Sequence, residues 1–304
     1  MNFVSYRGRI APSPTGLLHL GHARTFWIAQ ERARKNSGTL VLRNEDIGST
    51  RFKLEFVPQM IEDLRWFGFQ WQEGPDCRGA FGPYSQSERR NFYVAALDKL
   101  REDGFVYPCT CSRKDIQLAA SAPNLGDDNE PIYPGTCREN FEWRMTKCES
   151  GKASAYLTPK NHNAKFNWRF RVPDGEPISF LDKNFGSQQF IAGKDFGDFV
   201  VWRHDDVPAY QLAVVVDDAA MKISEVVRGA DLLLSTARQI LIYRALGLNP
   251  PDFFHCPLMT DAHGIRLAKR HDALSLRALR SQGIEPEILR ASWIKPDQSD
   301  QIAR

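Results

Sequence analysis

Two histidines near the N-terminus have the residue types and spacing that most directly suggest chemistry. They are His19 and His22 in the segment Arg9-Ile-Ala-Pro-Ser-Pro-Thr-Gly-Leu-Leu-His-Leu-Gly-His22, with Gly21 between them. The pattern places both imidazoles where a loop enters a helix, and the backbone N–H groups and positive dipole of a helix N-terminus attract phosphate. A glycine between them lets a phosphate approach the backbone closely. Either histidine alone is more typical of a helix cap or a packed residue, but the pair with its flanking prolines and glycines predicts an anion-binding loop.

Three of the six cysteines form a second candidate cluster. Cys109 and Cys111 are separated by one residue, and Tyr133-Pro-Gly-Thr-Cys137 brings in a third through a Pro-Gly turn. Two thiolates with this spacing can share a tetrahedral ion, and zinc with cysteine ligands is the usual structural site of that kind. A fourth ligand of the common type would be Cys148 or His162, while the turn can also direct Tyr133 toward the same point.

The elements around the histidines predict a strand, a loop, a helix and a second strand. Residues 3–10 alternate loosely and stop at the proline-rich loop, helical spacing of apolar residues begins at Leu20, and Asn36-Ser37-Gly38 ends it before the apolar residues 39–43. A unit of this kind implies a parallel sheet, whose ligands lie at the carboxyl ends of its strands.

The rest of the chain predicts scaffold elements and an inserted region. Amphipathic helices are expected over residues 53–67 and 88–102, and a region dense in Gly, Pro, Asn and Lys follows Phe105 up to about residue 194. Residues 210–216 form a nearly continuous apolar run, typical of a strand buried on both faces. A helix is expected over residues 235–246, with a basic and helical tail from His255 onward.

The composition is that of an ordinary globular protein. The chain has 304 residues, 42% of them hydrophobic and 25% charged, which allows about two domains. Forty Lys and Arg against 37 Asp and Glu give a net charge of +3, which does not by itself indicate a nucleic-acid or membrane partner. Any basic surface must therefore be local.

The N-terminus and the cysteines together predict a cytoplasmic location. Residues 1–10 carry Arg7 and Arg9 in a short apolar run, without the long apolar region of a signal peptide. No segment approaches the ~20 apolar residues of a membrane span, so no membrane partner is expected. Sparse cysteines that cluster in a chain of this length favour a reduced compartment and metal binding over disulfides.

In three separated places the sequence resembles the class I aminoacyl-tRNA synthetases, in the form found in their glutamyl branch. The segment from Arg9 to His22 resembles their first signature motif, and the second half of their core is matched by residues 210–218, 227–231 and 235–240. The resemblance implies an α/β fold: a Rossmann-like parallel-sheet core with a zinc-containing insertion and a short helical C-terminal segment. The implied boundaries are 1–106 and 196–250 for the two halves of the core, 107–195 for the insertion, and 251–304 for the ATP loop with the C-terminal helices.

The second signature of that family, a lysine-serine-lysine loop that holds the ATP phosphates, is altered in this chain. The corresponding stretch reads Arg266-Leu-Ala-Lys-Arg270, so the first lysine is an arginine and the serine is an alanine. The resemblance implies that the ATP-binding residues are His19, Gly21, His22, Arg266 and Lys269, that His19, His22 and Lys269 are catalytic, and that Mg²⁺ accompanies ATP. Without the resemblance, the same basic stretch would be a solvated surface.

A glutamate site can be argued from charge as well as from the resemblance. Glutamate has two carboxylates and one ammonium, so its site needs guanidinium groups, which bind carboxylates as a fork, and at least one carboxylate. Arg9, Arg228 and Glu45 meet that requirement, although each could be an ordinary surface ion pair. The resemblance implies a glutamate site made of Arg9, Ile10, Ala11, Pro12, Ser13, Glu45, Tyr210 and Arg228, with Glu45 at the amino group and Arg228 at the side-chain carboxylate.

Chain length separates the branches of the family. Full glutamyl-tRNA synthetases carry a helical anticodon-binding domain after the ATP loop, whereas this chain ends at Arg304. The shortened form resembles the branch that activates glutamate without tRNA and attaches it to the queuosine base of tRNA(Asp), which also implies Tyr133 as the fourth zinc ligand. We expect a monomer. Two alternatives remain open: a minimal glutamyl-tRNA synthetase, and a non-catalytic, zinc-stabilised RNA-binding module. The altered sequence of the ATP loop favours the second alternative.

Overall fold

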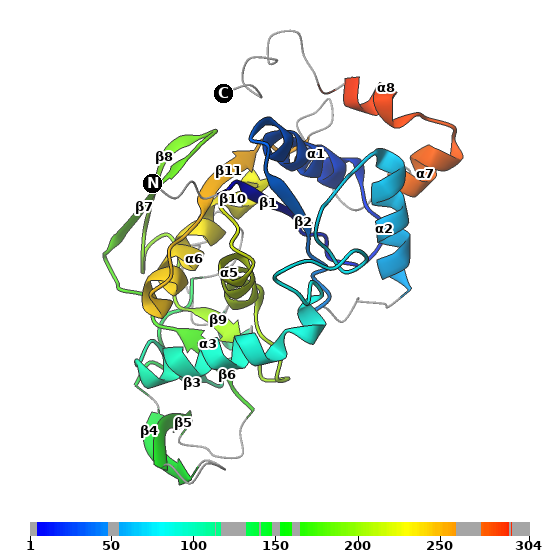
Figure 1. Ribbon diagram of the computed structural model, residues 1–304. Coiled ribbons are helices and arrows are strands. Elements are labelled where there is room, and N and C mark those ends of the chain that lie inside the picture. Colours follow the sequence, from blue (N-terminus) through cyan, green and yellow to red (C-terminus); the bar gives the residue numbers. More distant parts are fainter. Residues whose placement is uncertain are drawn as a thin grey trace.

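The structure is a computed structural model that describes residues 5–47, 55–112, 114–116, 132–139, 141–147, 153–159, 165–259, 275–291 and 293. It begins with the predicted strand, loop, helix and strand, as β1 (Arg7–Ile10), α1 (Leu20–Lys35) and β2 (Thr39–Leu42). β1 and β2 are parallel, with Arg9 opposite Val41. The prediction for this unit is therefore confirmed, and α1 packs against β1 and β2 (Figure 1).

A second pair of parallel strands lies beside the first. β10 (Glu225–Gly229) and β11 (Asp252–Cys256) are parallel neighbours with Arg228 opposite His255. The amide of Ser224, at the start of β10, donates to the carbonyl of Arg7 at 2.9 Å. β1 and β10 therefore lie side by side although they are far apart in the sequence, and side chains at their carboxyl ends come close together.

The prediction of a strand over residues 210–216 is wrong. These residues begin the helix α5 (Tyr210–Ala220), in which every residue from Leu212 to Asp218 is buried. A continuous apolar run does not distinguish a doubly buried strand from a helix buried on all sides. α5 is surrounded because α3 (Arg90–Glu102), α6 (Leu233–Leu246) and β9 (Phe199–Trp202) all pack against it (Figure 1).

Antiparallel pairing dominates the middle of the chain. β3 (Val106–Cys109), β6 (Asn167–Phe170) and β9 form one sheet, and β4 (Phe141–Lys147) pairs with β5 (Ala153–Pro159). The hairpin of β7 (Pro177–Asp182) and β8 (Gly186–Ile191) lies within residues 107–195, yet β7 is a parallel neighbour of β11. The sheets are thus mixed rather than purely parallel, and the middle region joins the core through β7.

Helices cover the remaining surfaces. The two expected amphipathic helices are present as α2 (Phe56–Phe67) and α3, and the helix expected over residues 235–246 is α6. Short 3₁₀ turns precede two of them: η1 (Gln86–Glu88) comes before α3, and η2 (Ala230–Leu232) comes before α6. α2 and α6 both end at a glycine with positive φ, Gly68 and Gly247, as left-handed helix ends favour. The short helices α7 (Leu276–Ser281) and α8 (Pro286–Ala291) follow, with α7 packed against α2. In the described part of the chain, no helix combines the length and the apolarity that crossing a bilayer requires.

Candidate active site

The end of β1 contributes a buried arginine to the site. Arg9 is only 4% exposed; its Nη1 donates to the carbonyl of Val227 on β10 at 3.0 Å, and its Nε lies 3.4 Å from Oδ1 of Asp218 on α5. Ile10 and Pro12 are buried beyond it, Ala11 is half-buried and Ser13 is exposed. The predicted segment thus runs from the core to the surface within five residues.

The end of β2 brings Glu45 to the same place. Its amide donates to the carbonyl of Pro12 at 3.0 Å, which ties the two strand ends together. Arg43, which is completely buried, donates to Glu45 Oε1 from Nη2 at 3.0 Å and from Nε at 3.3 Å. Burial raises the pKa of Glu45, and the nearby cations of Arg43 and Arg9 only partly offset that rise. The carboxylate is therefore stabilised by any further positive group that reaches it.

β10 supplies the opposite charge. Arg228 is 4% exposed and donates from Nη2 to Thr236 Oγ1 at 2.6 Å and from Nε to His255 Nε2 at 3.1 Å, whereas its buried Nη1 has no hydrogen-bond partner among the described residues. Burial lowers the pKa of Arg228 and the cation of Arg9 lowers it further, while Tyr210 and Asp218 offset part of that fall. An anion at Nη1 would supply the missing hydrogen bond and a counter-charge to the guanidinium.

Tyr210 stands at the start of α5, beside these groups. The surroundings of its phenol raise the pKa of that group by burial, and the cations of Arg228 and Arg9 offset part of the rise, while the residue as a whole is 40% exposed to solvent. The structure therefore brings together the predicted residues from four separated segments: the β1 end, the β2 end, the start of α5 and β10.

Three residues that sequence reasoning did not assign complete this cluster. Arg43 donates from Nη1 to Asp218 Oδ1 at 2.6 Å, and Asp217 beside it accepts from Arg89 Nε at 2.6 Å and from the hydroxyl of Tyr93 at 3.0 Å. Burial would raise the pKa of Asp218, but Arg43 and Arg9 outweigh it and lower that pKa. Two sequence features could have indicated these residues. Asp217 and Asp218 are adjacent carboxylates at the end of an apolar run, and Arg43 lies two residues before Glu45.

His19, Gly21 and His22 lie together at the N-terminus of α1. His19 is the residue that precedes the helix, its side chain makes no capping hydrogen bond, and its ring centroid is 6.2 Å from that of His22. A Cβ on Gly21 would meet no atom of the described residues within 4 Å beyond its own turn of helix, so these residues leave the space beside this backbone open. The two imidazoles and an accessible turn of backbone thus share one helix end, as the anion-binding prediction requires.

Arg266 and Lys269 lie outside the described residues, but the chain that follows them is placed. Ser275 forms a β-bridge with His19, and the amide of Leu276 donates to the carbonyl of Leu18 at 2.8 Å. Ser275 and Leu276 are therefore bonded to the two residues that precede α1. This pairing places Ser275, five residues after Arg270, next to His19.

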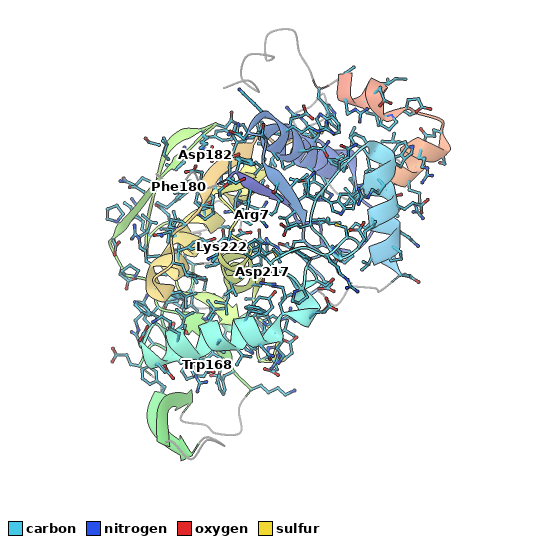
Figure 2. The ribbon with its side chains drawn as sticks, in the orientation of Figure 1. Arg7, Trp168, Phe180, Asp182, Asp217 and Lys222 are labelled. Carbon is cyan, nitrogen blue, oxygen red and sulfur yellow. The ribbon has the colours of Figure 1, made fainter. Side chains whose placement is uncertain are left out.

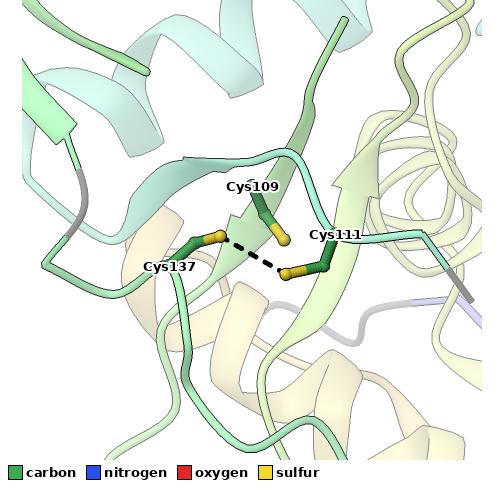
Figure 3. Close-up of side chains that lie close together, drawn as sticks. All are labelled: Cys109, Cys111 and Cys137. Carbon is green, nitrogen blue, oxygen red and sulfur yellow. Dashed lines mark hydrogen bonds between the residues drawn. The ribbon is translucent and has the colours of Figure 1, made fainter. Parts of the chain in front are cut away.

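The cysteines Cys109, Cys111 and Cys137 form a second candidate site, shown in close-up in Figure 3. The sulfurs of Cys109, Cys111 and Cys137 all lie within 4.8 Å of one another, and those of Cys111 and Cys137 are 3.4 Å apart. The Tyr133 hydroxyl lies 3.4 Å from the sulfur of Cys109 and 3.7 Å from that of Cys111. Cys148 and His162, the other two candidates, lie outside the described residues.

These four side chains fit a tetrahedral zinc ion. Zinc distances of about 2.3 Å to sulfur and 2.0 Å to oxygen place two sulfurs about 3.8 Å apart and a sulfur about 3.5 Å from an oxygen. The tyrosine oxygen is oriented by the amide of Cys137, which donates to it at 2.8 Å. Burial opposes ionisation of Cys137, but hydrogen bonds from Tyr133 and the Thr110 backbone outweigh it and lower its pKa to about 7. Burial raises the pKa of Cys111 to about 12 and also raises that of Tyr133, so the remaining ligands would ionise as the metal binds and displaces their protons. Arg169 adds positive charge, because its Nε donates to the sulfur of Cys109 at 3.2 Å.

Comparison with known proteins agrees with the geometry. The family model described as "tRNA synthetases class I (E and Q), catalytic domain" matches residues 5–295. A protein of Symbiobacterium thermophilum named "Glutamyl-Q tRNA(Asp) synthetase" is 49% identical over 92% of this chain and 83% of its own length. "Glutamate--tRNA ligase 2" of Syntrophus aciditrophicus is 41% identical over 95% of this chain, but over only 57% of its own length.

Solved structures give the same result for the fold. The structure titled "Crystal Structure of Glutamate-tRNA Synthetase from Elizabethkingia anophelis" superposes with a TM-score of 0.72 at 27% identity, covering 88% of this chain and 53% of that one. The resemblance seen in the separated motifs is thereby confirmed along almost the whole chain. The chain belongs to the class I tRNA synthetases of the E and Q kind, and it is an aminoacyl-tRNA synthetase-like ligase.

Proposed function

We propose that the protein activates glutamate with ATP, without tRNA, and transfers it to the queuosine base in the anticodon of tRNA(Asp). The observation that carries glutamate recognition is the pair of buried, incompletely neutralised charges at one edge of the sheet. Arg228 has a buried Nη1 without a hydrogen-bond partner in the described part of the chain, and Glu45 has a raised pKa despite its arginine neighbours. Glutamate would satisfy both groups, because its carboxylate can bind Arg228 and its ammonium can bind Glu45.

The polar residues then have distinct roles. The side-chain carboxylate of glutamate binds Arg228 with Tyr210 beside it, and its ammonium binds Glu45. The residues from Arg9 to Ser13 line the path from this pocket to the surface, where the α-carboxylate meets ATP. That carboxylate attacks the α-phosphorus in line, a new carbon–oxygen–phosphorus anhydride forms, and pyrophosphate leaves. Catalysis requires positioning and electrostatic stabilisation rather than a protein nucleophile.

The start of α1 is the proposed ATP site. His19, Gly21 and His22 offer imidazoles and backbone N–H groups to the phosphates, and Ser275, five residues after the altered loop, pairs with His19. Arg266 and Lys269 of that loop would contribute positive charge at the leaving pyrophosphate. Mg²⁺ bound with ATP would neutralise part of the phosphate charge.

The cysteine site is proposed as structural. Cys109, Cys111, Cys137 and Tyr133 would hold one zinc ion with no open position, which ties β3 to the turn at residues 133–137. Thiolate ligands persist in a reducing compartment, in keeping with a cytoplasmic protein, which we propose acts as a monomer.

The acceptor is proposed from the relatives. Proteins named "Glutamyl-Q tRNA(Asp) synthetase" match this chain at 49% and 48% identity and over 83% and 82% of their own length. The second candidate, a minimal glutamyl-tRNA synthetase, is favoured by the 41% identity to proteins named glutamate--tRNA ligase. The two candidates share the activation of glutamate with ATP and differ in the acceptor, which is the queuosine base of tRNA(Asp) for the first and tRNA(Glu) for the second.

One experiment separates these candidates. Purified protein is incubated with ATP, radiolabelled glutamate and either tRNA(Asp) carrying queuosine, tRNA(Asp) carrying guanosine at the same position, or tRNA(Glu). Label on the queuosine-containing tRNA alone is the expected result. Label on tRNA(Glu) alone would establish the minimal glutamyl-tRNA synthetase instead. No label, together with no glutamate-dependent ATP–pyrophosphate exchange, would leave a non-catalytic RNA-binding module.

A further inference from the structure

The guanidinium of Arg228 is held by a chain of buried polar groups that the reaction itself does not use. His255 is completely buried; its Nε2 lies 3.1 Å from Arg228 Nε, and its Nδ1 lies 2.6 Å from Asp182 Oδ2. Thr236 accepts from Arg228 Nη2 at 2.6 Å and donates to the carbonyl of Leu232 at 3.2 Å. Two of the three guanidinium nitrogens are therefore fixed, and only Nη1 is left for a ligand.

The hydrogen bonds determine where the proton of His255 lies. Arg228 Nε can only donate, so His255 Nε2 must accept, and the ring proton must be on Nδ1. Asp182 accepts that proton at Oδ2, which also accepts from the His255 amide at 3.0 Å. Its other oxygen accepts from the amides of Asn184 and Phe185 at 3.0 and 2.8 Å. Thr236 Oγ1 lies 3.1 Å from the same Nε2, so the N–H of a protonated imidazole could bond to Thr236, but Arg228 Nε would then lose its acceptor.

Strand register assembles this arrangement from three neighbouring strands. Arg228 on β10 is directly opposite His255 on β11, and Asp182 ends β7, opposite Phe253 of β11. Figure 2 shows Asp182 where the β7–β8 hairpin meets the core sheet. The hairpin from the middle of the chain thus contacts His255 through the Asp182 carboxylate and through Asn184 Nδ2, which donates to the His255 carbonyl at 2.8 Å.

We propose that Asp182 and His255 are positioning residues that hold Arg228 with Nη1 directed to the side-chain carboxylate of glutamate. Asp182 fixes the tautomer of His255, and His255 in turn fixes the rotation of the guanidinium. The inference rests on the proposed function, because it assigns Arg228 to that carboxylate. A guanidinium with one free nitrogen, already oriented, binds the carboxylate without losing side-chain freedom at that step.

The test compares two substitutions of His255. In His255→Gln the side-chain oxygen remains within reach of Arg228 as an acceptor, whereas His255→Leu has a similar volume and no acceptor. We expect His255→Leu to raise the KM for glutamate in ATP–pyrophosphate exchange by about tenfold or more, with little change in the KM for ATP. His255→Gln should stay within about threefold of the wild type, since the acceptor is retained. His204→Leu, at an exposed histidine bonded to Asn167, is the matched control and should change neither KM.

A second measurement does not depend on activity. Imidazole ¹⁵N spectroscopy of the wild type should show Nδ1 protonated and Nε2 unprotonated for the histidine signal that disappears in His255→Gln. The opposite tautomer would overturn the inference, and so would equal glutamate KM values in the two folded variants. Wild-type protein without glutamate-dependent exchange would instead overturn the proposed function, and the positioning role with it.

Discussion

At the scale of single residues, the site is a set of buried charges balanced against one another. Arg43 is paired with both Glu45 and Asp218, and Asp217 is paired with Arg89, all of them essentially removed from water. Buried ions are costly unless their partners are well placed, so such a network is retained where orientation matters more than stability. Here it holds Glu45 and Arg9 in position beside Arg228.

Loss of the Arg228 guanidinium should affect glutamate and not ATP. We expect Arg228→Gln to lower kcat/KM for glutamate in pyrophosphate exchange by about 100-fold or more, because a charge-assisted hydrogen bond to a carboxylate is lost. Arg244→Gln is the control, since Arg244 forms an exposed ion pair with Glu176. Similar small effects of the two substitutions would remove Arg228 from the pocket.

At the scale of elements, α1 is fastened to β10 by a nearly buried carboxylate. Arg32 on α1 donates to both oxygens of Glu225 at 2.7 and 2.8 Å, and Tyr6 and Lys183 donate to the same carboxylate at 2.6 and 2.9 Å. Burial would raise the pKa of Glu225, but these hydrogen bonds outweigh it and lower it to about 2. The contact fixes the helix whose N-terminus is the proposed ATP site.

Removal of that contact should destabilise the fold. Arg32→Gln is expected to lower the free energy of unfolding by about 3 kcal/mol, since a buried carboxylate loses its partner. Arg34→Gln, two residues along the same helix in an exposed pair with Glu31, should cost less than about 0.5 kcal/mol. Urea denaturation of both variants at neutral pH measures the difference, and equal midpoints would contradict it.

The same carboxylate predicts a pH dependence of stability. The pKa of Glu225 is lowered from its ordinary 4.5 to about 2 in the folded protein, so its stabilisation is complete above pH 4.5 and is lost as the pH falls toward 2. The shift corresponds to about 3 kcal/mol. We expect Glu225→Gln to flatten this part of the stability–pH curve. A slope identical to that of the wild type in urea titrations between those pH values would show that Glu225 is not responsible.

A second element, the turn at residues 133–137, depends on the proposed zinc ion. We expect Cys137→Ser to abolish bound zinc, measured by atomic emission of the purified protein, and to lower the melting temperature by about 5 °C or more. Cys77→Ser changes an exposed cysteine outside the cluster and should retain full zinc. Glutamate-dependent exchange should decline through instability rather than through a changed glutamate KM. Equal zinc content in the two variants would exclude Cys137 as a ligand.

At the scale of the whole molecule, segments far apart in the sequence are joined around the sites. The β7–β8 hairpin joins β11, and the segment after the altered loop returns to α1 and α2 (Figure 1). Arg277 on α7 contacts Asp63 of α2 at 3.1 Å, and Asp63 is only 1% exposed. This ion pair holds the residues that follow the predicted ATP loop.

The docking of α7 should therefore influence ATP and not glutamate. We expect Arg277→Gln to raise the KM for ATP by about three- to tenfold, because one end of the loop is less well positioned. Arg280→Gln serves as the control. Arg280 is on α7 like Arg277, but its ion pair with Glu62 of α2 is exposed to solvent. Pyrophosphate exchange at varied ATP concentration makes the comparison. A change confined to the glutamate KM would contradict this account.

Most local elements and the residue types of the site are predictable from sequence patterns alone. Periodicity predicted α1, α2, α3 and α6 because an amphipathic pattern is a local property, and the spacing of histidines and cysteines indicated anion and zinc chemistry. Where the pattern was ambiguous, tertiary structure decided: residues 210–216 are helical because other elements surround them on all sides.

The pairing of the buried charges, in contrast, depends on the folded arrangement of strands and helices. Arg228, His255 and Asp182 come from β10, β11 and β7, and their contact follows from strand register, which no short segment specifies. Arg43, Asp217 and Asp218 were visible in the sequence, but their pairing depends on how α5 packs beneath the strand ends. The chemistry of each side chain can be read from its residue type. The partner of a buried charge depends on non-local packing, because both charges are removed from water only when the chain folds.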